Sequence, residues 1–316
     1  MASWGTQRNW RWCSKCQGLW FAGNPSQGVC PQGGTHTKSG SGNYSLVHQA
    51  SPTPANHQAN WRWCSKCQGL WFAGNMTAGK CKAGGGHSRT GSGNYALAHQ
   101  VGAGQIGWRW SSKCQGLWFG PNAAQSNCPA GGKHSSAGSG SYRLPIVTSR
   151  IRIHVKILTA PNVALTTLFQ NMREVFATAN VDVEWATQES LSLPTLNIVD
   201  VGQCILGQTT GEQNQLFNNR NFAGANDIVV YFVLATDPPF NGCAAHPAGR
   251  PSAVVVKAAT QWTFAHEVGH VLGLFHVNNN DRLMTGNGTA NITNPPPDLA
   301  ASEGGTMQAS ALTVNV

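Results

Sequence analysis

The chain has 316 residues, a formal net charge of +9 and 41% hydrophobic residues, which suffices for two domains that each bury a core. No apolar stretch is long enough to span a bilayer, and the N-terminal MASWGTQRNWRW lacks the apolar centre of a secretory signal. Residues 1–150 hold 14 Lys or Arg and no Asp or Glu, whereas residues 151–316 hold 7 basic and all 12 acidic residues. The charges of +14 and −5 predict two modules with different roles.

The first half consists of one unit repeated three times. WRWCSKCQGLWFAGN occurs at 10–24 and 61–75, and WRWSSKCQGLWFG occurs at 108–120, so that the copies span about 8–50, 59–101 and 106–145. In the first copy we expect short strands at 10–16, 18–22, 28–31 and 43–48. Three copies of about four strands predict an all-β, β-trefoil-like module over 1–145, and the rival is a string of small zinc-stapled units.

The cysteines of the repeats allow two interpretations. The first two copies carry C-x2-C-x13-C-x5-H, a zinc pattern made by Cys13, Cys16, Cys30 and His36 and by Cys64, Cys67, Cys81 and His87. In the third copy Ser111 replaces the first cysteine, which leaves only Cys114, Cys128 and His134. We therefore favour disulfides, pairing Cys16–Cys30, Cys67–Cys81, Cys114–Cys128, Cys13–Cys64 and, in the second half, Cys204–Cys243. Disulfides predict a secreted, extracellular protein.

The composition of the repeats favours a binding module over a catalyst. Without a carboxylate this half cannot perform two-carboxylate glycoside hydrolysis. Its basic charge favours an anionic partner, and we expect an acidic glycan or a cell-surface polymer, by analogy with other repeated β modules. Nucleic acid is a weaker candidate because no recognition helix is evident, and a module that only adds solubility is the plain alternative. Trp10, Trp12, Trp20 and Tyr44 offer rings for stacking on sugars, although filling the core is the simpler role for each.

A short linker at 146–150 precedes a second domain over 151–316. IRIHVKIL at 151–158 alternates like a strand, residues 166–180 have helical periodicity, and 181–186, 227–234 and 252–258 predict further strands. A helix follows at about 261–273, with Phe264, Val268, Val271 and Leu272 on its apolar side. A weak helix is expected at 298–310, and these elements together predict an α+β domain.

The motif HEVGHVLGLFH, at 266–276, carries the chemistry of this domain. His266 and His270 lie four residues apart on one helical face, and Gly273 permits the turn that brings His276 back as a third ligand. Three histidines with an open fourth position describe a catalytic Zn²⁺ site, in which Glu267 takes a proton from a metal-bound water. A core helix with satisfied histidines explains one such residue but not three at this spacing.

The spacing H-E-x-x-H-x-x-G-x-x-H, with Met284 eight residues after His276, resembles the metzincin zinc endopeptidases from about residue 150 to the end. The resemblance implies a Met-turn at Met284 and an edge strand near Gly242 to His246 that pairs with an extended peptide. His246 itself is expected to be an exposed loop residue. Val277 and Gly286 depart from the better-known subfamilies, so no subfamily is assigned.

The sequence therefore predicts a monomeric zinc endopeptidase that acts on a protein or peptide and is targeted by a basic binding module. Two alternatives stay open. One is a lectin-like binding protein or toxin with an inactive or auxiliary peptidase half, and the other is a non-peptidase hydrolase that uses the same zinc. The intact Glu267 argues against the first, and an edge strand for peptide pairing distinguishes the second.

Overall fold

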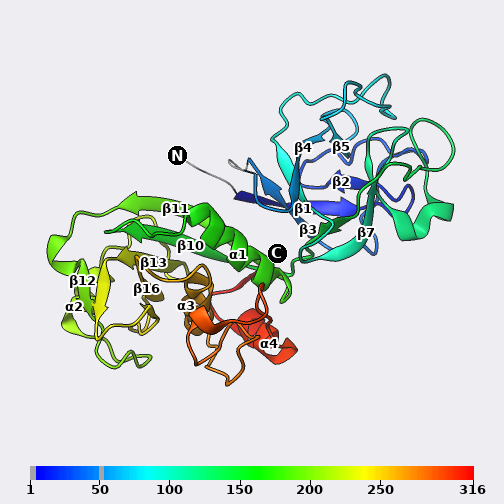
Figure 1. The fold of residues 1–316 in the computed structure, drawn as a ribbon. Helices are drawn as coiled ribbons and strands as arrows, with labels where there is room; N and C mark the ends of the chain where they lie inside the picture. The colour runs from blue at the N-terminus through cyan, green and yellow to red at the C-terminus, as the bar shows by residue number, and fades with distance from the viewer. Residues whose placement is uncertain (1–4, 50–52) are drawn as a thin grey trace. The chain divides into compact units, whose positions relative to one another are not determined.

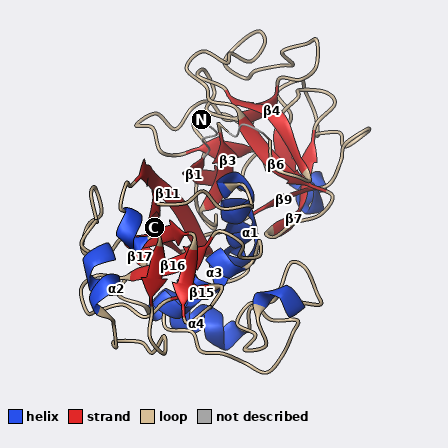
Figure 2. Cartoon of the chain, turned by 60° about the vertical axis from the view of Figure 1, so that its left-hand side comes forward, coloured by secondary structure: helices blue, strands red, loops and turns tan. Residues whose placement is uncertain are grey.

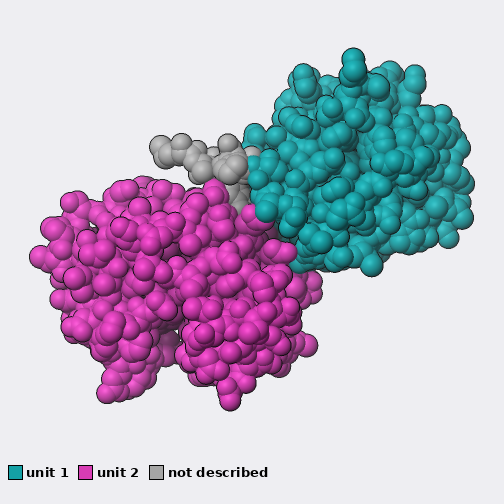
Figure 3. Space-filling model, viewed as in Figure 1, with its two compact units in different colours: residues 1–147 teal, residues 148–316 magenta. Residues whose placement is uncertain are grey.

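The computed structural model describes residues 5–49 and 53–316. The chain forms two compact units, Met1–Val147 and Thr148–Val316 (Figure 3). Within the described residues, no helix is long and apolar enough to cross a membrane. Each unit is considered separately below.

Each copy of the repeat contributes three strands to the first unit. They are β1 Gly5–Trp12, β2 Leu19–Phe21 and β3 Tyr44–His48, then β4 His57–Trp63, β5 Leu70–Phe72 and β6 Tyr95–His99, then β7 Gln105–Trp110, β8 Leu117–Phe119 and β9 Tyr142–Leu144 (Figure 1). The prediction of a strand at 28–31 is wrong. Gly28 there has φ +63°, and a Cβ on it would lie 2.1 Å from the carbonyl oxygen of Cys67, so this segment is a loop pressed against the next copy.

The three copies contact one another in a cycle. Trp10 packs edge-on against Tyr95 of the second copy, with ring centroids 5.1 Å apart, and Trp61 packs in the same way against Tyr142 of the third. Trp108 closes the cycle on Tyr44 of the first copy. All three tryptophans are fully buried, in one core to which every copy contributes. No copy can bury its aromatic residues alone, and the trefoil-like classification stays a prediction.

The aromatic residues considered for sugar stacking are mostly core residues. Trp10 and Trp20 are at most 1% exposed and Tyr44 is 3% exposed, while Trp12 is half-buried against the same core. The phenol of Tyr44 donates to Gln105 Oε1 of the third copy at 2.6 Å, so its polar end is also used internally. The simpler expectation for these rings, filling the core, describes the structure.

The expected linker at 146–150 is not a free segment. Ile146 forms a bridge with Tyr44, and the amide of Val147 donates to the carbonyl of Asn43 at 2.8 Å. The strand β10 then begins at Ser149. Backbone pairing therefore occupies most of the segment, because a strand edge was available on either side of it.

The second unit contains a mixed sheet of order β11-β10-β13-β16-β15 (Figure 1). The strands in this order are β10 Ser149–Ile157, β11 Val181–Ser190, β13 Ile228–Val233, β16 Ser252–Val256 and β15 Gly242–Cys243, and a sixth short strand, β17 Val314–Asn315, pairs with β10. The first four run parallel, and β15 lies antiparallel to β16 at one edge. Their alternation and β-branched composition made the four long strands predictable. Three further strands were not predicted, because they are too short to carry a pattern: β12 Ile198–Asp200, β14 Ala235–Asp237 and β17.

Helices α1 Leu165–Ala177 and α3 Thr263–Val271 pack together beside this sheet (Figure 2). Phe169 of α1 stacks on Trp185 of β11 at 4.4 Å and meets Phe264 of α3 at 5.0 Å between ring centroids. Phe264 also contacts Phe232 of β13, so α3 meets the sheet directly through this ring pair and indirectly through Phe169. Both helices were predicted, as was α4 Ala301–Ala309, whereas the short α2 Gly211–Leu216 was not.

The cysteines correct the disulfide prediction for the repeats. Cys204 and Cys243 form the predicted disulfide of the second unit. The eight repeat cysteines, in contrast, are free and buried. They gather as Cys13, Cys16, Cys30 and His36, as Cys64, Cys67, Cys81 and His87, and as Cys114, Cys128 and His134. Cys13 and Cys64 belong to different clusters, so they do not pair either.

Candidate metal centre

Helix α3 presents two of the three predicted metal ligands. Its apolar side is buried as expected, with Phe264 and Val268 fully inaccessible and Val271 7% exposed. His266 and His270 leave the opposite side one turn apart, because residues four apart project from the same helical face. The helix is therefore fixed by its buried face, which in turn fixes the direction of both imidazoles.

The third histidine returns through a glycine turn. Gly273 has φ +96°, a conformation that costs other residues energy, and the amide of Leu274 donates back to the carbonyl of Gly269 at 3.0 Å. The chain then reverses, and His276 Nε2 comes within 3.2 Å of His266 Nε2 and 3.0 Å of His270 Nε2. The predicted role of Gly273 is thus visible in the backbone.

The three Nε2 atoms form a triangle with sides of 3.0 to 3.2 Å. Tetrahedral zinc with Zn–N bonds near 2.05 Å places its nitrogen ligands about 3.3 Å apart, so the triangle has the size that one ion requires. His266 Nδ1 donates to the carbonyl of Leu283 at 2.7 Å, and His270 Nδ1 donates to that of Leu274 at 2.8 Å. These bonds place the protons on Nδ1 and leave the Nε2 lone pairs facing the centre.

Burial favours the neutral imidazole of His266 and His270, which is the form that binds a metal. Desolvation lowers the pKa of His266 to about 4 and also lowers that of His270. Exposure increases along the triad from His266, which is 6% exposed, to His276 at the surface. One side of the triad is therefore open to solvent, where a fourth ligand can enter.

Glu267 lies in the same cleft and is 6% exposed. Burial raises the pKa of its carboxyl to about 8, and an adjacent divalent cation would favour the ionised form. Gly242 of the edge strand β15 lies directly against it, because a Cβ at Gly242 would be 2.5 Å from Glu267 Oε1. The cleft has a volume of about 240 Å³, and Gly242 of the edge strand lines it together with His266 and His276.

Met284 is fully buried behind the helix. A Cβ on Gly269 would lie 2.6 Å from Met284 Sδ, so the thioether fits against the one residue of α3 that has no side chain. Val277 donates to the carbonyl of Met284 at 2.8 Å and accepts from the amide of Gly286 at 3.0 Å. These bonds form a parallel bridge between Val277 and Thr285, which closes the loop after His276. Gly286 lines the cleft and offers no side-chain donor there.

The edge strand and His246 depart from the prediction in detail. The strand covers only Gly242–Cys243, and His246 is half-buried, with Nδ1 3.1 Å from the carbonyl oxygen of Pro247. His246 does not line the cleft. Sequence reasoning missed the carbonyls of Leu274 and Leu283, because a backbone acceptor carries no residue signature. It also missed that glycine is needed at 242 to admit the Glu267 side chain.

Comparisons with known proteins find similarity at low identity and only among solved structures. No family model and no curated protein matches the sequence. Among solved structures, the chain is similar to metalloproteinase-II from Bacteroides fragilis, at 15% identity and a TM-score of 0.39 over 51% of this chain and 52% of that one. It spans about half of that protein. The archaemetzincin of Methanopyrus kandleri matches at 15% identity and a TM-score of 0.35, over 50% of this chain and 94% of that one.

A zinc-dependent peptidase from Methanocorpusculum labreanum matches at 14% identity and a TM-score of 0.33, over 49% of this chain and 99% of that one. At such identities and TM-scores the likeness defines neither the fold nor the activity of this chain. The triad of His266, His270 and His276 could hold a metal ion, and the carboxyl group of Glu267 lies in the same cleft.

Proposed function

We propose that this chain is a zinc endopeptidase of the metzincin type, with His266, His270 and His276 as metal ligands and Glu267 as the general acid–base. The observation that carries the proposal is the 3.0 to 3.2 Å triangle of Nε2 atoms in a cleft that also contains Glu267. Zinc bound there supplies a Lewis acid that lowers the pKa of water and polarises a carbonyl.

Glu267 performs the proton transfers. Its carboxylate takes a proton from the attacking water and gives it to the departing amine, and a pKa near neutrality suits a group that must do both. The Glu267 carboxylate is buried in the cleft and so has little contact with bulk water. Gly242 has no side chain and leaves room for this carboxylate. Met284 supports α3 from behind and takes no part in the proton transfers.

The substrate is expected to bind as an extended peptide along β15. This strand ends the sheet order, so one of its edges faces away from β16, and Gly242 on it lines the cleft. An unpaired strand edge offers backbone donors and acceptors to a peptide, which an ester or a sugar would not use. This feature favours a peptidase over a different zinc hydrolase.

The test compares the wild-type chain with Glu267→Ala and His276→Ala. Wild-type protein should cleave casein, and Glu267→Ala should keep its zinc while losing about 10²- to 10⁴-fold in rate. His276→Ala should lose both zinc and activity. His246→Ala is the matched control, because that imidazole lies outside the cleft, and it should retain both. Wild-type protein that holds zinc at the triad but cleaves no peptide would favour the lectin-like or non-peptidase alternatives.

We also propose that the repeat unit binds an anionic glycan or another anionic cell-surface polymer. Its support is the charge of residues 1–150 alone, since the tryptophans are largely internal. Retention on a sulfated polysaccharide that falls steeply with salt, and no retention on a neutral one, is the expected result. Equal retention on both polymers would contradict an electrostatic partner. An extracellular location is proposed from the Cys204–Cys243 disulfide only.

A further inference from the structure

The long loops of the repeats contain an unusual concentration of buried side chains that bind metals. In the first copy, the loop from 22 to 43 connects β2 to β3 and has no strand of its own. Loops of this length are rarely ordered without a function or a fastening. Cys30 and His36 lie on it and are both buried, against Cys13 and Cys16 of the β1–β2 turn. The loop is thus attached to the strands at its cysteine and histidine.

The distances within these clusters match a single tetrahedral ion and exclude a disulfide. Cys13 Sγ lies 3.9 Å from Cys30 Sγ, and Cys16 Sγ lies 3.6 Å from His36 Nδ1. Tetrahedral zinc with Zn–S bonds of about 2.3 Å and Zn–N bonds of about 2.05 Å sets these separations near 3.8 and 3.6 Å, whereas a disulfide needs about 2.05 Å. The second copy repeats them, at 3.9 Å and 3.6 Å.

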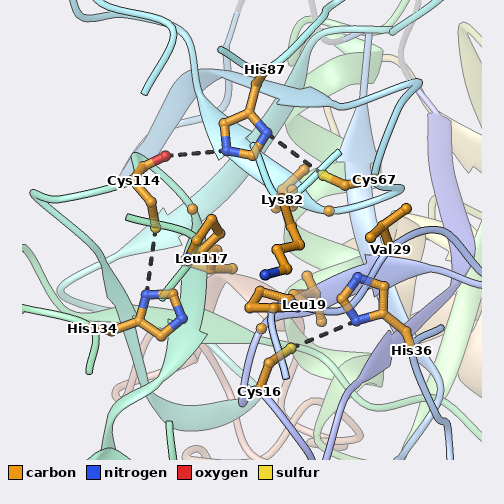
Figure 4. Close-up of a pocket in the computed structure, with 16 residues that line it drawn as sticks. Cys16, Leu19, Val29, His36, Cys67, Lys82, His87, Cys114, Leu117 and His134 are labelled. Atoms are coloured by element: carbon orange, nitrogen blue, oxygen red, sulfur yellow. Dashed lines mark hydrogen bonds between the residues drawn. The ribbon is translucent and has the colours of Figure 1, made fainter. Parts of the chain in front are cut away.

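The imidazoles are oriented for ligation through Nδ1. His87 donates from Nε2 to the carbonyl of Cys114 at 3.1 Å, so its unprotonated Nδ1 faces Cys67 (Figure 4). His36 and His87 each stack on a buried tryptophan, with ring centroids 5.3 Å apart, which restricts rotation of the ring. In the second copy the amide of Ser88 also donates to Cys64 Sγ at 3.4 Å, as expected of a thiolate that accepts hydrogen bonds.

We infer that each of the first two copies holds one zinc ion through three thiolates and one imidazole, and that the third copy is the same site with one ligand removed. In the third copy Cys114, Cys128 and His134 still converge, and the fully buried Ser111 takes the position of the missing cysteine. Its loop instead carries the short 3-10 helix Gly120–Gln125. This inference concerns sites far in sequence from the histidine triad and does not depend on the proposed peptidase activity.

The surrounding charge suits such sites. Three thiolates around one dication leave a net negative charge, and the repeats supply only basic partners. Lys15, within the first Cys-x2-Cys turn, donates to the carbonyl of Gly33 on the long loop at 3.0 Å, and Lys66 does the same to Gly84 at 2.5 Å. Each lysine thus joins the two segments that provide the cysteine and histidine side chains. The role of the metal is structural, since four protein ligands leave no open position.

The test counts metal ions and thiols in the full chain. Wild-type protein should contain two zinc ions beyond the one at the histidine triad, and both should survive His270→Ala, which removes only the triad ion. Cobalt exchanged into that variant should give a thiolate-to-metal charge-transfer band, which a histidine triad cannot produce. Failure of the peptidase proposal would leave both results unchanged.

Substitution at equivalent positions of the copies sharpens the test. Cys13→Ser gives the first copy the incomplete ligand set of the third copy and should release one zinc ion. Ser111→Cys completes the ligand set of the third copy and should add one zinc ion. Ser112→Cys is the matched control, because residue 112 is exposed and adds a thiol outside the cluster. If Cys13→Ser does not fold, the additional zinc ion expected in Ser111→Cys still tests the inference. Two results together would overturn the inference and support disulfides: His270→Ala contains no zinc at all, and the denatured wild-type protein has no thiols that can be alkylated.

Discussion

The two units of this protein gather metal-binding side chains in opposite ways. In the first copy of the repeat, four donors meet and all four residues are buried, whereas the triad of the second unit has three donors and ends in the exposed His276. Four donors complete a tetrahedron, while three leave a position for water and substrate. Ligand number and exposure, more than the presence of histidine, thus separate a cluster that fastens a loop from one suited to chemistry.

The same contrast applies to the cores. The repeat unit has one core shared by three copies, in which each copy depends on the other two. The second unit builds its core from a continuous parallel sheet with α1 and α3 against it. Because the core is shared, the stability of each copy depends on the other two. In the second unit, packing against the sheet fixes α3, and the histidines project from this helix.

Chelation should have the largest effect and should act on the two kinds of cluster differently. A strong zinc chelator reaches the exposed end of the triad first, so peptide cleavage should be abolished while the thiols of the repeats stay protected from alkylation. Activity should return when zinc is added back. Simultaneous loss of activity and exposure of thiols, across a chelator titration, would contradict the distinction between open and closed clusters.

Trp61→Ala should strongly destabilise the repeat unit. The side chain is fully buried and touches both Phe72 of its own copy and Tyr142 of the next, so removing it should cost about 3–5 kcal/mol in the free energy of unfolding. Urea unfolding measures the loss. Ile106→Ala is the control, because Ile106 is 62% exposed and should change stability by less than about 0.5 kcal/mol.

The response of the second unit to Trp61→Ala is equally informative. Because the two units are separate compact bodies by their internal contacts, the rate of peptide cleavage per molecule should remain unchanged below the temperature at which the repeats unfold. A parallel loss of cleavage would show that the units unfold together.

Gly242→Ala should impair catalysis more than folding. The added methyl group would lie 2.5 Å from Glu267 Oε1, so the carboxylate must move, and a displacement of about 1 Å can cost about 10²-fold in rate. Zinc content should be unaffected, because the triad lies on other residues. Gly305→Ala in α4 is the control, since nothing lies within 4 Å of its added methyl group. A wild-type rate in Gly242→Ala would mean that Glu267 does not require its present position.

The smallest effect concerns pH and the buried His154. Burial is the main cause that lowers the pKa of this imidazole in the folded protein, against the opposing hydrogen bond to Asp227. The unfolded chain therefore binds more protons just below its ordinary pKa of about 6.5, and stability is full above that pH and falls as the pH decreases through it. Thermal unfolding of wild type and His154→Asn at several pH values measures the difference. If the change of stability with pH were the same in His154→Asn as in the wild type, other titratable groups would be its cause.

Where residue spacing alone sets geometry, sequence reasoning succeeded. The distance of four between His266 and His270 places them on one helical face whatever the rest of the fold does. Gly273 could be recognised because its φ of +96° is nearly closed to other residues. The long strands of the second unit were likewise predictable, since a buried parallel strand needs a β-branched run. Short elements such as β12 could not be predicted, because three residues are too few to show an alternation of apolar and polar side chains.

The state of the repeat cysteines could not be predicted in this way. Spacing alone allowed both a disulfide and a zinc site, and the missing ligand at Ser111 favoured the wrong one for the first two copies. What decided the matter is a distance of 3.9 Å between Cys13 Sγ and Cys30 Sγ, which depends on how the 22–43 loop folds back on the β1–β2 turn. The loss of one cysteine in the third copy therefore gave no ground for pairing the cysteines of the other two copies as disulfides.

By itself, the sequence determined the threefold repeat, the division of charge and the helix that carries the histidines, because repetition, composition and local periodicity are properties of neighbouring residues. Only the tertiary structure decided that Gly242 lies against Glu267, that Leu283 orients His266, and that the tryptophans close a shared core. Each of these joins residues far apart in the chain, and such contacts follow from the packing of whole elements, which no local pattern encodes.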